Sequence, residues 1–149
     1  MNVFRSFDIA ASGLTAERLR MDIISSNIAN VNTTKTNRGT PYRRQLPVFE
    51  AVFDNEVKDI EKNEKGEQFH GKGVRVREIR DDMAPFKTVY DPNHPHADDK
   101  GYVHLPNVNI VKEMVDMITA SRAYEANVTV LSTSRQMFNS ALEISGGGR

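Results

Sequence analysis

The sequence contains neither cysteine nor tryptophan in its 149 residues. The absence of cysteine excludes disulfide bonds, zinc sites built on Cys ligands and thiol chemistry. The formal net charge is zero, so the chain lacks the basic field that attracts nucleic acid, and little repulsion opposes self-association. No run approaches the roughly 18 apolar residues of a transmembrane helix, and early acidic residues interrupt any secretory signal. We therefore expect no nucleic-acid partner, no direct membrane span and no cleaved leader.

Catalytic motifs are also missing. The chain has no Gly-rich phosphate loop, no Gly-x-Ser-x-Gly elbow and no His-Glu-x-x-His zinc motif. Residues 90–101 gather His94 and His96 with several aspartates, and such a group can ligate zinc or iron. However, prolines hold this segment extended and only His104 stands near as a third histidine, so we favour a solvated turn. We expect no cofactor, and a metal-dependent enzyme is the weakest of three functional hypotheses.

The longest regular pattern lies at the C-terminal end, in residues 109–144. Two interleaved heptad rows of apolar side chains are the signature of a coiled-coil helix. Pro106 precedes the pattern and three glycines follow it, which suits the start and the end of a helix. At 1.5 Å per residue the helix would be about 54 Å long, too long for such a short chain to cover. The first row is Ile110, Met117, Tyr124, Leu131 and Phe138, and the second contains Met114, Val128 and Leu142.

A second helix is predicted near the N-terminus, over residues 3–31. Its apolar residues keep three- and four-residue spacing. The small residues around Gly13 fit either the close approach of another helix or ordinary loose packing. Asn27, Asn30 and Asn32 mark its end, because asparagine competes for backbone hydrogen bonds and tolerates left-handed geometry. Two interpretations of these asparagines stay open. They simply terminate the helix, or their amides bond the C-terminal helix or a neighbouring subunit.

The middle of the chain is predicted to be an extended loop followed by a small β-rich insert. Residues 33–47 show no periodicity, and residues 45–57 fit either a strand pair or a short amphipathic helix. Residues 54–67 carry dense charge of both signs, which is typical of a solvated loop. Residues 74–79 alternate apolar and charged side chains, as a half-buried strand does, and residues 86–90 are a second strand candidate.

The expected fold class is therefore mainly α, with a small β-rich insert. Two long terminal helices pair as an antiparallel helical hairpin or coiled coil, and an extended loop follows the first helix. We expect residues 1–35 and 106–149 to form the helical domain and residues 36–105 to form the loop and the insert. A helical hairpin that closes within one chain and a helix that needs other subunits both fit the pattern.

Two motifs resemble the signature shared by bacterial flagellar rod and hook proteins. The first is Ser-Asn-Ile-Ala-Asn-Val-Asn-Thr at residues 26–33. The second runs from Gly-Tyr-Val at residues 101–103 to Ser-Arg-Ala-Tyr-Glu-Ala-Asn-Val at residues 121–128. The resemblance covers residues 1–53 and 71–144. Within that family, the short length and the Gly-Thr-Pro-Tyr turn at residue 39 resemble a subunit of the proximal rod.

The resemblance implies a structural protein without catalysis. Proteins of this family polymerise helically into the shaft that crosses the periplasm and transmits motor torque, with their terminal helices innermost. They leave through the flagellar type III export apparatus without a cleaved leader. The implied partners are other copies of the chain, other rod proteins and that apparatus. The residues expected at assembly contacts are Phe7, Leu14, Met21, Asn27, Ile28, Asn30, Asn32, Met114, Met117, Tyr124, Val128, Leu131, Phe138 and Leu142.

A third hypothesis belongs to a different class. It is a self-contained helical-hairpin adaptor that binds one partner helix in a groove. A rod subunit should gain helix on assembly, whereas an adaptor should be fully helical when dilute.

Overall fold

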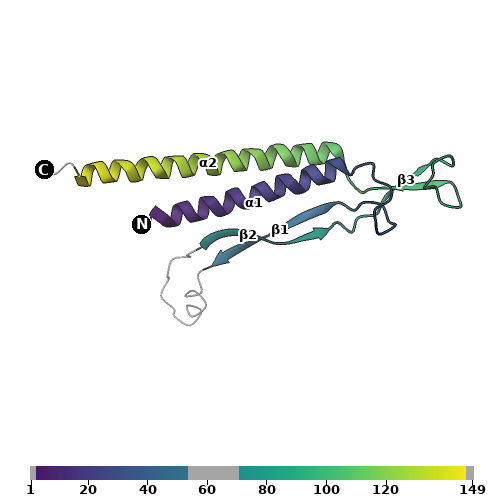
Figure 1. Ribbon diagram of the computed structural model, residues 1–149, viewed down its shortest axis with the longest axis horizontal. Coiled ribbons are helices and arrows are strands. Elements are labelled where there is room, and N and C mark those ends of the chain that lie inside the picture. Colours follow the sequence, from purple (N-terminus) through teal and green to yellow (C-terminus); the bar gives the residue numbers. More distant parts are fainter. Residues whose placement is uncertain (1–2, 54–70, 147–149) are drawn as a thin grey trace, which may run out of the picture. The chain divides into compact units, whose positions relative to one another are not determined.

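The computed structural model describes residues 3–53 and 71–146 (Figure 1). Two long helices stand at the two ends of the chain, and a small antiparallel β insert lies between them in sequence, which confirms the predicted fold class. The charged loop predicted over residues 54–67 lies outside the described residues. The elements in order are α1 (Val3–Ala29), β1 (Gln45–Phe53), β2 (Gly71–Asp81), β3 (Lys87–Tyr90), β4 (Tyr102–Leu105) and α2 (Ile110–Gly146).

The helices begin and end close to the residues that the sequence indicates. After α1 ends at Ala29, Asn30 Nδ2 donates to the Ser26 carbonyl at 2.9 Å and Asn30 Oδ1 accepts the Thr33 hydroxyl at 3.2 Å. Before α2 begins, Asn109 Oδ1 accepts the backbone N–H of Val111 at 3.0 Å. Asn109 therefore caps the N-terminus of α2, and Asn30 joins the last turn of α1 to the turn that follows it.

The insert contains two separate two-stranded sheets, β1–β2 and β3–β4. The segment that fitted either a strand pair or a helix is a strand from Gln45 to Phe53. The strand predicted over residues 74–79 is longer, from Gly71 to Asp81. β3 pairs antiparallel with β4, which brings Tyr90 opposite Tyr102. β4 was not expected from the sequence.

The chain divides into two compact units, and each contains part of both long helices. The first unit comprises Met1–Arg18, Phe49–Arg77 and Ser121–Arg149. In it the two helices approach closely, because a Cβ added at Gly13 would lie only 2.9 Å from Asn127 Nδ2. β2 joins them through Val74, whose backbone N–H donates to the Ser12 hydroxyl at 3.1 Å. Small residues therefore set the spacing of the elements here.

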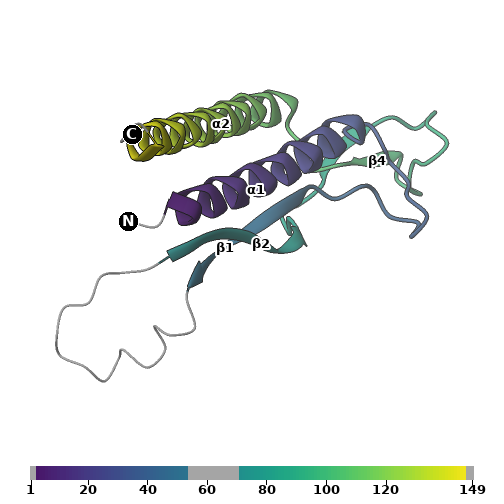
Figure 2. The ribbon, with the colours of Figure 1, turned by 60° about the vertical axis from the view of Figure 1, so that its left-hand side comes forward.

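The second unit comprises Leu19–Val48 and Glu78–Ala120. In it the C-terminal part of α1 lies beside the N-terminal part of α2 in both ribbon views (Figure 2). The two run antiparallel, since Arg20 of α1 approaches Asp116 at 3.9 Å while Asn27, later in α1, bonds Glu113, earlier in α2. Neither α1 nor α2, over the described residues, is apolar enough along its length to cross a bilayer. The buried apolar residues of this unit include Ile23, Ile24, Val103, Val108 and Ala120.

Candidate functional site: a buried polar junction and an exposed helix face

Three polar side chains are buried where the end of α1 meets the start of α2. Asn27 is 1% exposed, Arg44 7% and Glu113 0%. They come from the last turns of α1, the segment before β1 and the first turn of α2. Polar groups persist in such a place only when hydrogen bonds replace the water that they lose. We call these three residues, together with Tyr42, whose hydroxyl donates to Asn27, the polar junction.

The Asn27 amide uses its full hydrogen-bonding capacity. Its Nδ2 donates to the Gln45 carbonyl at 2.9 Å and to Glu113 Oε2 at 3.0 Å. Its Oδ1 accepts the Tyr42 hydroxyl at 2.9 Å and the backbone N–H of Gln45 at 2.9 Å. An amide has two donor hydrogens and two acceptor lone pairs, and all four are used here. Asn27 therefore joins α1 to both the extended segment and α2.

The three predicted asparagines thus have different positions. Asn27 bonds the C-terminal helix, as the second interpretation required. Asn30 is half-buried and caps its own helix end, as the first interpretation required. Asn32 is exposed in the turn that follows. The motif combines one tertiary contact with a helix stop, and a single sequence gave no means of separating the two.

Arg44 supplies the positive charge of the polar junction. Its Nε donates to Glu113 Oε1 at 2.6 Å, and one terminal nitrogen donates to Asp116 Oδ2 at 3.2 Å. Its other terminal nitrogen lies 3.6 Å from Asp82 Oδ2. One guanidinium therefore faces three carboxylates, an arrangement that its planar set of donors suits. Nothing in the sequence indicated this role, because an arginine in a loop beside Arg43 gives no signal of burial.

The junction fixes three segments and leaves its polar groups engaged with one another. Both oxygens of Glu113 are bonded, one by Arg44 and one by Asn27. The backbone N–H of Arg44 donates to Asn107 Oδ1 at 2.8 Å, which adds the segment before α2. Such a network specifies one arrangement of these chain segments. Its polar groups bond one another and are not presented to a substrate.

One predicted row of α2 does pack within the chain. Met117, Tyr124, Leu131 and Phe138 are half-buried, each within its own unit. On α1, side chains with the same seven-residue spacing are also half-buried. The α1 residues are Phe7, Leu14, Met21 and Ile28.

The second predicted row of α2 does not pack within the chain. Its members Met114, Val128 and Leu142 are exposed, and so is Ile110, the first residue of the other row. The residues that complete the packed face are shifted by one position to Glu113, Ala120, Asn127 and Ser134. The physical reason is that small or hydrogen-bonded residues allow the helices to approach closely, so the larger apolar side chains point away. The expected role of Met114, Val128 and Leu142 in assembly contacts stays a prediction.

The first half of α2 therefore exposes an apolar face. Val111, Met114, Val115 and Ile118 follow the three- and four-residue spacing of one helix side and are 53–71% exposed. All four belong to the second unit. A contiguous apolar surface of this kind usually marks a contact with another protein. We call these four residues the outer α2 face.

The segment with His94 and His96 is organised by hydrogen bonds. His94 Nδ1 accepts the backbone N–H of His96 at 3.0 Å, and His96 Nδ1 lies 2.8 Å from the Thr34 hydroxyl. The backbone N–H of Tyr102 donates to Asp98 at 2.8 Å, which is the main cause that lowers the pKa of this carboxyl below its ordinary value of 3.8. Among residues 3–53 and 71–146, no group of three or more side chains is arranged to hold a metal ion.

Comparison with known proteins gives matches over nearly the whole chain. A family model described as "Flagella basal body rod protein" matches residues 7–35, and one described as "Flagellar basal body rod FlgEFG protein C-terminal" matches residues 99–144. The flagellar basal-body rod protein FlgC of Borreliella burgdorferi is 51% identical, over 99% of this chain and 100% of that protein. The FlgC proteins of Aquifex aeolicus and Bacillus subtilis are 46% and 40% identical, over 96% and 97% of this chain and 97% and 99% of theirs. The chain therefore belongs to the FlgC family of flagellar basal-body rod proteins.

Proposed function

We propose that this chain is a structural subunit of the bacterial flagellar basal-body rod and that the outer α2 face carries its contacts with neighbouring subunits. Family membership supports the first part. The second part rests on one observation, which is that the four apolar side chains of the outer α2 face are 53–71% exposed. A helix face of this kind gains stability only when another surface covers it.

Covering the outer α2 face would contribute a few kcal/mol toward assembly. Full burial of a valine, isoleucine or methionine side chain contributes about 1.5–3 kcal/mol. The four residues of the outer α2 face are already partly covered, so a neighbour would add roughly half of that for each, or about 3–6 kcal/mol for every interface. Part of this is offset by ordering the subunit, but a polymer repeats the contact along its length.

The finer features of the proposal follow from the same resemblance. We propose that the rod segment is the proximal one, that the subunits polymerise helically with the terminal helices innermost, and that the assembled rod transmits torque across the periplasm. The partners would be copies of this chain and other rod proteins. The subunit would leave through the flagellar type III export apparatus without a cleaved leader, and it would have no catalytic role.

The test separates assembly from export. We would replace the native gene with Met114→Asp, which places a charge in the outer α2 face, and measure the subunit in the culture medium and in purified basal bodies. Lys112→Asp is the matched control, because it puts the same side chain at an exposed polar position of the same helix turn. We expect Met114→Asp to be exported and excluded from rods, and Lys112→Asp to be incorporated. Incorporation of Met114→Asp at the wild-type level would refute the role of this face.

A further inference from the structure

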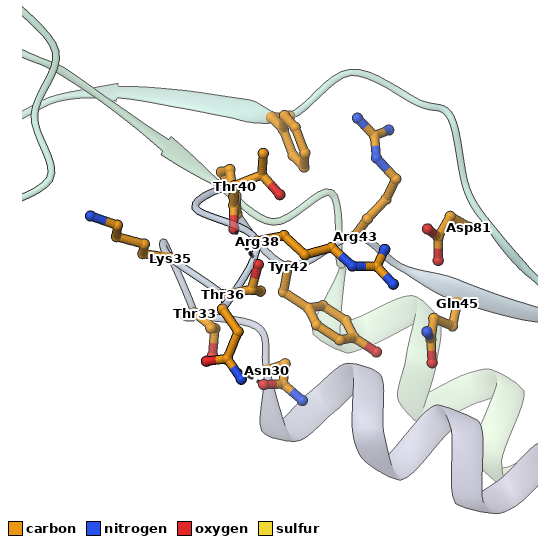
Figure 3. A pocket seen from close by; sticks show the side chains of 13 residues that line it. Asn30, Thr33, Lys35, Thr36, Arg38, Thr40, Tyr42, Arg43, Gln45 and Asp81 are labelled. Carbon is orange, nitrogen blue, oxygen red and sulfur yellow. Dashed lines mark hydrogen bonds between the residues drawn. The ribbon is translucent and has the colours of Figure 1, made fainter.

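A polar pocket lies in the second unit, on the side of the extended segment that follows α1 (Figure 3). Its volume is about 660 Å³. The walls come from the segment between Asn30 and Gln45, completed by Asp81 and Phe86. This volume lies within the range of about 300–1,000 Å³ that is usual for ligand sites, and it exceeds what a single inorganic ion fills.

Hydrogen bonds hold the rim of the pocket in shape. The backbone N–H and the hydroxyl of Thr36 both donate to the Thr40 carbonyl at 2.8 Å. Gly39 adopts a left-handed backbone with φ of 77° between them, and its N–H donates to the Thr36 carbonyl at 2.8 Å. At the base, the N–H of Tyr42 donates to the Thr33 carbonyl at 3.0 Å. A rim built in this way needs little ordering when a ligand binds.

Two aromatic or cationic side chains of the wall are also fixed. The Tyr42 hydroxyl is bonded to Asn27 Oδ1 in the polar junction. The Arg43 guanidinium lies 4.3 Å from the centre of the Phe86 ring and donates to the carbonyl of Ala84 at 3.1 Å. Its charge is therefore held in place by a ring and by a neutral acceptor, and no carboxylate of the described residues pairs with it.

The remaining cations of the pocket have no such engagement. Lys35 and Arg38 are exposed and form no ion pair with a carboxylate within residues 3–53 and 71–146. Figure 3 shows Arg38 near Tyr42 in the middle of the group, whereas Lys35 points away from it. The lining residues thus include three cations, of which Lys35 points outward, and one carboxylate, Asp81. The Thr40 hydroxyl and the Asn37 amide also line the pocket and are neutral hydrogen-bond donors.

We propose that this pocket binds the carboxylate side chains of an acidic peptide segment on a neighbouring subunit. The proposal rests on the proposed function, since a rod subunit has neighbours on several sides. An excess of fixed and unpaired cations selects an anionic partner, and arginine matches the geometry of a carboxylate with two parallel hydrogen bonds. The pocket has room for several residues of an extended chain. A free anion would leave most of this volume empty.

The test uses the purified full chain and three defined probes. The isotope-labelled protein is titrated with a blocked tetraglutamate peptide, with a blocked tetraglutamine peptide and with inorganic phosphate, while NMR follows the backbone amides of residues 33–43. We expect saturable shifts with tetraglutamate that weaken as salt increases, and none with tetraglutamine. Arg38→Gln should weaken binding by at least about fivefold, and adding Lys35→Gln should weaken it further. The matched control is Arg80→Gln, which removes an exposed arginine from β2 of the same unit and should leave the affinity unchanged.

Three results would overturn the proposal. They are the absence of saturable shifts with tetraglutamate, binding of phosphate alone, and equal weakening by Arg38→Gln and Arg80→Gln. None of these results depends on the rod. If the chain is absent from purified basal bodies, the proposed function fails whatever the peptide does. If the chain is present there while Arg38→Gln keeps the wild-type affinity for tetraglutamate, only the pocket is refuted.

Discussion

Replacing Arg44 by methionine should destabilise the protein far more than the same change at Arg75. Both arginines pair with a glutamate, Arg44 with Glu113 at 2.6 Å and Arg75 with Glu50 at 2.9 Å. Their surroundings differ. The side chains of Arg44 and Glu113 are 9% and 0% exposed, whereas those of Arg75 and Glu50 are 66% and 39% exposed. Removing one partner of a buried pair leaves an uncompensated charge and costs about 3–5 kcal/mol. An exposed pair contributes about 0–1 kcal/mol.

The loss at Arg44 should lie in the upper part of this range. Asp116 and Asp82 also approach the guanidinium, so its removal leaves three carboxylates close together without a cation. Urea unfolding followed by circular dichroism measures the effect. With a slope of about 2 kcal/mol per molar, we expect Arg44→Met to lower the midpoint by roughly 2 M and Arg75→Met by less than about 0.5 M.

A double variant checks the physical reason. Arg44→Met with Glu113→Met removes both charges of the buried pair, and such replacements are often neutral or stabilising. We therefore expect it to be more stable than Arg44→Met alone. Equal midpoints for Arg44→Met and Arg75→Met would refute the reasoning, since burial is the main difference between the two pairs.

Three further predictions concern single features of the chain. Asn27→Leu should lower the free energy of unfolding by about 3 kcal/mol in urea, because it leaves buried partners unsatisfied, whereas Asn30→Leu should cost only about 1 kcal/mol; equal losses would contradict the separate roles of the two asparagines. Gly39→Ala should cost about 1–2 kcal/mol in the same assay, through its φ of 77° alone. Gly73→Ala should cost at least 1 kcal/mol more, because φ is 121° there and the added Cβ would lie 2.2 Å from Ser12 Oγ. The reverse order would show that the Ser12 side chain moves aside without cost. Replacing His94 and His96 by glutamine should leave the melting temperature and swimming unchanged, and one equivalent of zinc or iron in the purified wild-type protein would overturn this.

The parts of the fold that could be predicted from sequence are those that depend on local sequence signals. Asn30 marks the end of α1, Pro106 precedes α2, and the alternation at residues 74–79 identified β2. The long heptad pattern predicted α2 and one of its packed rows, which contains Leu131. Each of these signals depends on neighbours within a few residues, so a single sequence contains them.

The candidate site was harder to predict because it depends on tertiary contacts. α2 carries apolar residues on more than one side, so periodicity alone could not decide whether Met114 or Glu113 faces α1. Glutamate normally indicates an exposed position. The burial of Glu113 depends on its ion pair with Arg44, which belongs to a separate extended segment. The pairing of these two residues, 69 positions apart, leaves no pattern in either segment.

The central claim is that the outer α2 face is a contact between subunits of the rod. Electron cryomicroscopy of basal bodies purified from the bacterium that encodes this chain tests it most directly. We expect the density of this subunit within the rod, with Met114 and Ile118 within about 4.5 Å of side chains of another subunit. A rod in which this subunit is present but the face from Val111 to Ile118 is open to solvent would contradict the account.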